Sequence, residues 1–169
     1  MQGAEIDGYK VVGSIAYLNS LSNVWAVCAI GNAMVRKMVI KRLKNVHFAK
    51  LIDPSAKISD RASIGEGSII CAGSIITVDV HIGKHNIVNL NCTIGHDTVL
   101  SDFVTLYPNV NISGQVSIGE LVEFGTGSQI IQGLKIATGA NIGAGAVVVK
   151  NIEDDGIYAG CPARKIKGK

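Results

Sequence analysis

The chain has 169 residues, which fits one ordinary domain with a small addition and leaves no room for two full cores. Only 5% of the residues are aromatic whereas 20 are glycine, so the core must be aliphatic and the backbone must turn often. The formal net charge is +3, no aromatic residues are interleaved with the basic ones, and no apolar run approaches the roughly 20 residues of a membrane span, so the composition predicts neither nucleic-acid binding nor a membrane span.

The cysteines and the first residues of the chain indicate the cellular compartment in which the protein is expected. The four cysteines show neither a paired spacing nor a metal-binding spacing, and no charged and then apolar leader opens the sequence. Reduced thiols explain such cysteines best, because disulfides persist mainly in oxidising compartments. We therefore expect a cytoplasmic protein without disulfides.

Residues 1–50 are predicted to form a partial α/β region, a Rossmann-like remnant that caps the rest of the chain. Gly31 and Asn32 lie at a strand-to-helix turn, where the N–H groups of a helix can bind an anion, so they are candidate substrate-binding residues. The alternative at this turn is a plain capped helix. The expected elements are strands at Tyr9–Val12, Val24–Ile30 and His47–Ile52, a short helix at Ala16–Leu21, and a helix from the N-cap Asn32 to Lys44.

From residue 52 to residue 153 a large apolar residue recurs every six positions without interruption. A second column of mostly small or medium side chains follows each of these residues by four positions. Neither a helix nor a simple alternating strand has this period. The 17 members of the first column are Ile52, Ile58, Ile64, Ile70, Ile76, Ile82, Val88, Ile94, Leu100, Leu106, Ile112, Ile118, Phe124, Ile130, Ile136, Ile142 and Val148.

A period of six predicts short strands joined by tight corners, and three such units close one triangular coil of 18 residues. Gly, Asn and Asp are frequent just before the small inward residue, where a corner requires positive φ. The fold class is therefore predicted as mainly β: a left-handed parallel β-helix of hexapeptide repeats over residues 51–153, preceded by the small α/β fragment. Residues 154–169 are expected to form a closing loop and tail.

Three segments within this frame carry a resemblance to a known family: IGHDTVLSDF, NVNISGQVSIGE and YAGCPARK. With them the chain resembles the sialic acid O-acetyltransferase and UDP-amino-sugar N-acetyltransferase family over roughly Gly8 to Lys167. The resemblance implies transfer of an acyl group, expected to be acetyl, from acetyl-CoA to an amino or hydroxyl group of a sugar or nucleotide-sugar. It also implies a homotrimer with each site between neighbouring chains, and no metal.

The resemblance also implies catalytic residues. Family members carry a catalytic histidine followed by an acidic residue, and the matching positions here are His96 and Asp97. An imidazole suits the removal of a proton from an attacking amine or hydroxyl at neutral pH, and Asp97 would orient the ring. Gly114 lies one coil beyond His96, and its N–H is the candidate donor to the thioester carbonyl.

The cofactor-binding residues follow from the same family pattern, with one departure. The amino-sugar branch has a second histidine, nine residues after the first, that contacts the acyl-CoA. Here that position is Thr105, which is expected to contact the cofactor by a hydrogen bond but cannot titrate near neutrality. Gly114 and the pair Thr126 and Ala144, one coil apart, would contact the cofactor arm. Its phosphates would meet Lys150 of the β-helix and Gly160, Pro162, Arg164 and Lys165 of the closing loop, with a mobile basic tail as the alternative.

Full-length members of the family that the chain resembles begin with a glycine loop and a first βαβ unit. About 30 to 40 of these family positions have no counterpart in this chain before GAEIDGYKVVG. Two other functions stay open. The first, suggested by this missing match and by Thr105, is a non-catalytic β-helix assembly subunit. The second is a β-helix carbonic anhydrase, which would need a metal held by His81, His85 and His96, although their spacing does not match that family. His81 and His85 are otherwise expected to be solvated surface residues.

Overall fold

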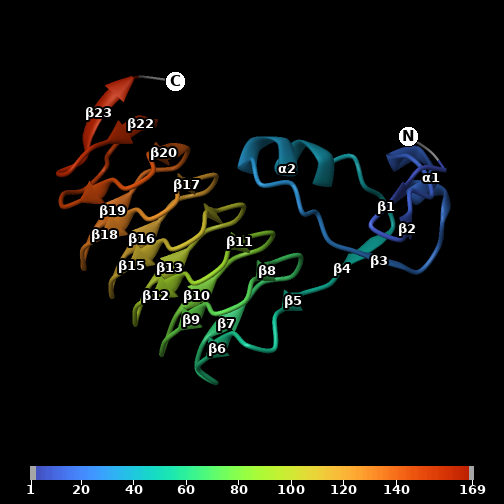
Figure 1. Cartoon of the computed structure of the whole chain (residues 1–169), viewed down its shortest axis with the longest axis horizontal. Helices are drawn as coiled ribbons and strands as arrows, with labels where there is room; N and C mark the ends of the chain where they lie inside the picture. Colours follow the sequence, from blue (N-terminus) through green and yellow to red (C-terminus); the bar gives the residue numbers. More distant parts are fainter. Residues whose placement is uncertain (1–2, 168–169) are drawn as a thin grey trace.

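The computed structural model describes residues 3–167 and shows a β-helix preceded by a small α/β region (Figure 1). The fold predicted from the six-residue period is confirmed: short parallel strands stack in three sheets that wind as a left-handed β-helix. Strand partners are 18 residues apart, as in the pairing of Ile82 with Leu100. Among the described residues, no helix has the length and apolarity to cross a membrane.

The three sheets are named here by their number of strands. The five-stranded sheet contains β7 (Ser63–Ile64), β10 (His81–Ile82), β13 (Val99–Leu100), β16 (Ser117–Ile118) and β19 (Lys135–Ile136). The six-stranded sheet contains β6 (Lys57–Ile58), β9 (Ile75–Ile76), β12 (Thr93–Ile94), β15 (Asn111–Ile112), β18 (Gln129–Ile130) and β21 (Val147–Val148). The eight-stranded sheet contains β5 (Leu51–Ile52), β8 (Ile69–Ile70), β11 (Ile87–Val88), β14 (Thr105–Leu106), β17 (Glu123–Phe124), β20 (Ala140–Ile142), β22 (Gly156–Ala159) and β23 (Arg164–Lys167).

The core is a column of aliphatic side chains stacked along the axis of the β-helix. Ile94, Leu106 and Phe124 are each fully buried, as the six-residue pattern predicts. Each inward side chain packs against its equivalents 18 residues before and after it, so burial of apolar area stabilises every coil through its neighbours. The corners between sheets are therefore fixed in position, and side chains mounted on them have a rigid base.

The N-terminal region, residues 3–50, contains one βαβ unit, formed by the strand, helix and strand expected at residues 24–52 but with shorter bounds. β3 (Val24–Ala26) and β4 (Val46–Phe48) pair in parallel, and α2 (Ala33–Ile40) connects them. The expected helix through Lys44 ends earlier, at Ile40, and the expected strand 47–52 is divided into β4 and β5. Before this unit come the hairpin β1 (Glu5–Ile6) and β2 (Tyr9–Lys10) and the short helix α1 (Ile15–Ser20).

Helix α2 lies against the eight-stranded sheet, and Arg36 is its main contact. The guanidinium is completely buried. Its Nε donates to the His85 carbonyl at 2.9 Å, and its Nη2 donates to the Thr105 hydroxyl at 2.9 Å. Because a buried cation must have its N–H groups bonded, these contacts fix α2 in place over the β-helix.

His85 corrects one expectation about the corners. It was predicted to be solvated, yet it is only 6% exposed and lies between Phe48 and Phe103. The outward position is as predicted, but the N-terminal region covers this corner. An outward direction in a repeat therefore does not ensure contact with solvent.

The C-terminal segment closes the last coil. β22 pairs in parallel with β20, and β23 turns back antiparallel onto β22. The Ala163 N–H donates to the Val147 carbonyl at 2.8 Å, and the Val147 N–H donates to the Gly160 carbonyl at 3.0 Å. The closing loop is therefore packed on the β-helix, in contrast to the alternative of a mobile tail; residues 168–169 of the predicted tail lie outside the described residues.

Candidate functional site

His96 lies between β12 and β13, on the corner between the six-stranded and the five-stranded sheet. Asp97 adopts the positive φ of 57° that turns this corner. The His96 carbonyl accepts a hydrogen bond of 2.7 Å from the Gln115 N–H of the next coil, and the Asp97 N–H donates to Val78 of the previous coil. Both neighbouring coils thus hold the backbone, while the His96 side chain stays 53% exposed.

The His96 ring is paired with the adjacent carboxylate. Its Nδ1 lies 2.7 Å from Oδ2 of Asp97. Because a carboxylate accepts hydrogen bonds, the neutral ring carries its proton on Nδ1 and keeps the lone pair on Nε2. That tautomer is the one a general base requires. The structure thus pairs the two residues that were predicted to be catalytic, and their role in catalysis stays a prediction.

Gly114 lies directly beneath the imidazole. A Cβ at Gly114 would stand 2.6 Å from His96 Nε2, so only glycine leaves room for the ring in this position. In the described part of the chain, no hydrogen bond uses the Gly114 N–H. The corner therefore offers a base nitrogen and a free backbone donor within one coil of each other.

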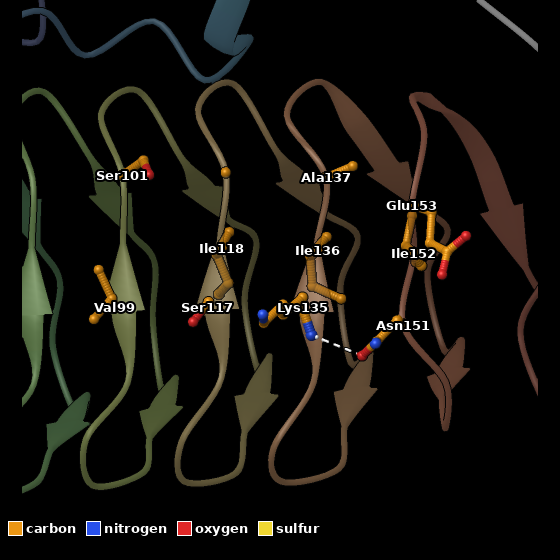
Figure 2. Close-up of a pocket in the computed structure, with 11 residues that line it drawn as sticks. Val99, Ser101, Ser117, Ile118, Lys135, Ile136, Ala137, Asn151, Ile152 and Glu153 are labelled. Atoms are coloured by element: carbon orange, nitrogen blue, oxygen red, sulfur yellow. Dashed lines mark hydrogen bonds between the residues drawn. The ribbon is translucent and has the colours of Figure 1, made fainter.

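A groove of about 480 Å³ runs along the outer face of the five-stranded sheet (Figure 2), and His96, Asp97 and Gly114 are not among the residues that line it. It begins at Val99, three residues after His96, and ends at Asn151 and Glu153 of the last coil. Short side chains such as Ser117 and Ala137 line it together with the longer Lys135. The groove could hold an extended ligand that runs parallel to the axis from the His96 coil to the C-terminal end.

A second pocket of about 340 Å³ adjoins the end of this groove and shares Asn151 and Ile152 with it. Three predicted cofactor-binding cations line it: Lys150, Arg164 and Lys165. Lys165 pairs with Asp154, and this hydrogen bond raises the pKa of the lysine and lowers the pKa of the aspartate. Lys150 and Arg164 make no ion pair among the described residues, so both charges are available to an anionic ligand.

Two further predicted cofactor residues lie on a different corner. Thr126 follows β17 and Ala144 follows β20, so both lie between the eight-stranded and the six-stranded sheet. His96 and Gly114 lie at the opposite edge of the six-stranded sheet. A single chain therefore does not bring the two sets together, and only a second copy could place one set beside the other.

The prediction that Thr105 contacts the cofactor is corrected to a structural role. Thr105 is fully buried, its hydroxyl donates to the Gly31 carbonyl at 2.7 Å, and it accepts from Arg36. No surface of Thr105 is left for a ligand. The sequence missed Arg36 as its partner, because the sequence alone did not show that α2 covers β14.

The proposed anion site at Gly31 and Asn32 is also corrected. Oε1 of Glu123 accepts from the Ala33 N–H at 2.9 Å and from Nδ2 of Asn32 at 3.1 Å, while Asn32 caps α2. A carboxylate of the chain itself thus occupies the N-terminus of the helix, in the manner favoured by the helix dipole. The alternative of a plain capped helix is the correct one.

The histidines required for a carbonic anhydrase are not arranged for a metal in this chain. The described residues contain no group of three or more His, Cys, Asp or Glu side chains that could hold an ion. His85 is enclosed by Phe48 and Phe103, whereas His81 is exposed and bonds to Ser63. The burial of His85 removes one of the three ligands that this alternative needs.

No family model matches the chain. It is 31% identical to the GDP-perosamine N-acetyltransferase of Escherichia coli O157:H7 over 138 residues, which make up 79% of this chain and 62% of that protein, so the chain spans less than two thirds of this relative. It superposes on the acetyltransferase domain of PglB from Neisseria gonorrhoeae FA1090 in complex with acetyl coenzyme A with a TM-score of 0.93 and 34% identity, covering 98% of this chain and 82% of that chain. For a perosamine N-acetyltransferase mutant from Caulobacter crescentus, in complex with CoA and GDP-perosamine, the TM-score is 0.90 and the identity 29%, over 99% of this chain and 82% of that chain.

Proposed function

The chain belongs to the hexapeptide-repeat sugar acetyltransferases, and on this premise we propose that it transfers an acetyl group from acetyl-CoA to an amino group of a nucleotide-linked sugar. The observation that carries the proposal is the pairing of His96 with Asp97 above the bare backbone of Gly114. The relatives named for perosamine, an amino sugar, favour nitrogen over oxygen as the acceptor atom.

His96 is the proposed general base. As the amine nitrogen of the acceptor attacks the thioester carbonyl carbon, Nε2 of His96 takes the proton that the nitrogen loses. The carbon–sulfur bond then breaks, and the CoA sulfur leaves and takes up a proton. Asp97 holds the ring in the required tautomer and stabilises the imidazolium that forms.

The Gly114 N–H is the proposed donor to the carbonyl oxygen as negative charge develops there. Support comes from its position one coil from His96 and from the absence of another acceptor among the described residues. A preorganised backbone donor of this kind typically contributes about 10² to 10³ in rate.

The cofactor is proposed to lie along the axis of the β-helix beside the His96 corner. Lys150 shares this corner column and lies three coils beyond His96, or roughly 14 Å at about 4.8 Å per coil. An acetyl group at His96 and phosphates near Lys150 and Arg164 fit the two ends of this arrangement. The closing-loop residues Gly160 and Pro162 would shape the pocket at the phosphate end, together with Lys165.

A homotrimer is proposed because the predicted cofactor residues occupy two edges of one sheet. Association of neighbouring chains would bring Thr126 and Ala144 of one copy towards His96 of the next. Exposed apolar side chains on and around the six-stranded sheet support burial there: Ile75, Val78, Leu90 and Ile131. Sedimentation of the purified protein tests this, and a monomer would contradict it. A cytoplasmic location stays a prediction.

Calorimetric titration of acetyl-CoA into the wild-type protein and His96→Ala tests the function. Because the base is not needed for binding, both proteins should bind with dissociation constants within about threefold, a difference of roughly 0.7 kcal/mol. Thiol release with amino-sugar nucleotides should then occur only with the wild type. An absence of binding by the wild type would contradict the proposal and favour a non-catalytic assembly subunit.

A further inference from the structure

His85 is a buried imidazole at the contact between the N-terminal region and the β-helix. Its ring meets Phe48 of β4 edge-on at 4.6 Å and stacks on Phe103 at 5.1 Å, both measured between ring centroids. Phe48 belongs to the N-terminal region, whereas Phe103 lies on a corner of the β-helix. The ring therefore fills the space between the two parts of the chain.

The buried side of this ring has no hydrogen-bond partner. Nδ1 of His85 is enclosed and unpartnered, and it faces Gly67, where any Cβ would overlap the ring. A proton on Nδ1 would be a buried donor without an acceptor, so the neutral ring keeps its proton on Nε2. In the doubly protonated ring both nitrogens carry a proton, so Nδ1 becomes a buried donor without an acceptor.

The charges around His85 do not provide a partner for an imidazolium. On α2, the buried Arg36 guanidinium donates to the His85 carbonyl, and Lys37 pairs with Glu120 and lies over the Phe103 ring. On the corners of the β-helix, the Lys84 ammonium pairs with Glu66 at 2.8 Å, and the backbone N–H of Lys84 donates to the Asp102 carboxylate. Burial is the main cause that lowers the pKa of His85; Arg36 and Lys84 lower it further, while Glu66 and Asp102 oppose this.

We propose that His85 is a proton-sensitive contact that keeps the N-terminal region seated on the β-helix at neutral pH and releases it when the ring is protonated. Once α2 and β4 have moved away, the imidazole and its charge reach water. The coils themselves stay folded, because their core is aliphatic and contains no titrating group comparable to His85.

The direction of the pH effect follows from the two states of the ring. A released His85 titrates near the ordinary value of about 6.5, whereas the seated ring has a lowered pKa. Below about pH 6.5 the released state therefore binds more protons than the seated state. The equilibrium constant for docking of the N-terminal region on the β-helix is therefore highest above that pH. As the pH falls, it decreases by at most about tenfold per pH unit for one proton.

The cysteines of the protein report on release. Cys28 is buried in the N-terminal region, Cys92 is buried in the β-helix core, and Cys161 is exposed. Labelling with 4,4′-dithiodipyridine, followed by peptide mass spectrometry, measures the rate at each thiol. On going from pH 7 to pH 5, the rate at Cys28 relative to Cys161 should rise several-fold, while Cys92 stays unlabelled. A constant ratio, or labelling of Cys92 together with Cys28, would overturn the proposal.

His85→Phe is the matched variant, because Phe103 in the same corner column already adopts a positive φ of 59°. It keeps an aromatic ring between Phe48 and Phe103 but cannot titrate. In this variant the labelling rate at Cys28 relative to that at Cys161 should therefore not change with pH. His47→Gln, which removes an exposed histidine of the N-terminal region, should keep the wild-type response. A pH response retained in His85→Phe would overturn the proposal.

A second measurement uses the wild type alone, so it does not depend on whether the N-terminal region of His85→Phe docks on the β-helix. Imidazole carbon NMR signals, followed as a function of pH, give the titration midpoint of each histidine. The His85 midpoint should lie below the ordinary imidazole value of about 6.5, and backbone signals of α2 should change with the same midpoint. A His85 midpoint at or above that ordinary value would overturn the proposal.

Discussion

The imidazole of His96 packs on the backbone of Gly114, and a Cβ at Gly114 would stand 2.6 Å from Nε2 and 2.7 Å from Cε1 of that ring. The proposed base and the proposed carbonyl donor are thereby placed next to each other by two successive coils. Because corners of adjacent coils are locked by backbone hydrogen bonds, this geometry does not depend on a mobile loop.

Gly114→Ala should displace the His96 ring and lower kcat by about 10²-fold, because a group held off its position loses most of its catalytic effect. The melting temperature should change little, since the ring can move into solvent. Gly95→Ala is the contrasting variant, because its methyl would stand 2.5 Å from the Gly114 backbone nitrogen. It should instead destabilise the fold by about 1–3 kcal/mol. Equal losses of stability in the two variants would contradict this account.

Asp97→Asn should lower kcat by about 10²-fold, at the lower end of what general-base catalysis contributes. Asparagine tolerates the positive φ of this position, but it no longer fixes the proton on Nδ1 of His96. Asp79→Asn is the matched control, one coil earlier with a φ of 56° and an exposed pairing to Arg61. Steady-state rates of thiol release compare the two. A loss of rate in Asp79→Asn as large as in Asp97→Asn would rule out a specific role for Asp97.

Much of the fold could be predicted because the pattern is set by neighbours one coil apart. The column through Ile94, Leu106 and Phe124 repeats a local requirement, so the period alone defines the coils. The same reasoning placed His96 and Asp97 on a corner, since an outward slot is part of the repeat. It could not separate an exposed corner from a covered one, which is why His85 was misjudged.

The contacts with the N-terminal region could not be predicted, because they join residues that are far apart in sequence. Glu123 reaches the N-terminus of α2 across 90 positions, and Arg36 reaches Thr105 across 69. No short motif marks such pairs. Arginine within an amphipathic helix normally suggests solvent exposure, so the complete burial of Arg36 runs against the usual interpretation of its sequence.

Arg36→Met should lower the free energy of unfolding of the N-terminal region by about 3–5 kcal/mol, because several buried carbonyls lose their donor together. Burial lowers the pKa of this guanidinium from its ordinary value, but its hydrogen bonds require the charged form. Hydrogen exchange of α2 measures the effect. Arg42→Met, at an exposed position beyond the same helix, should change exchange little. Similar exchange in both variants would contradict the anchoring role.

Lys150→Ala combined with Arg164→Ala should weaken acetyl-CoA binding by about 10²-fold or more, since each of the two charge-assisted hydrogen bonds is worth about 1.5–3 kcal/mol. The loss should be smaller in high salt, which screens the exposed cations. Lys57→Ala removes an exposed lysine of β6, far from the closing loop, and should leave affinity unchanged. Calorimetry measures all three proteins, and unchanged affinity in the double variant would place the phosphates elsewhere.

His96 is the proposed base in acetyl transfer to an amino sugar. The most direct test is the steady-state rate of thiol release from acetyl-CoA, with an amino-sugar nucleotide such as GDP-perosamine, for wild type, His96→Ala and His81→Ala. His81 is an exposed histidine of the five-stranded sheet and serves as the matched control. We expect kcat to fall by about 10²- to 10⁴-fold in His96→Ala and to stay at the wild-type level in His81→Ala. Turnover of His96→Ala at the wild-type rate would contradict it.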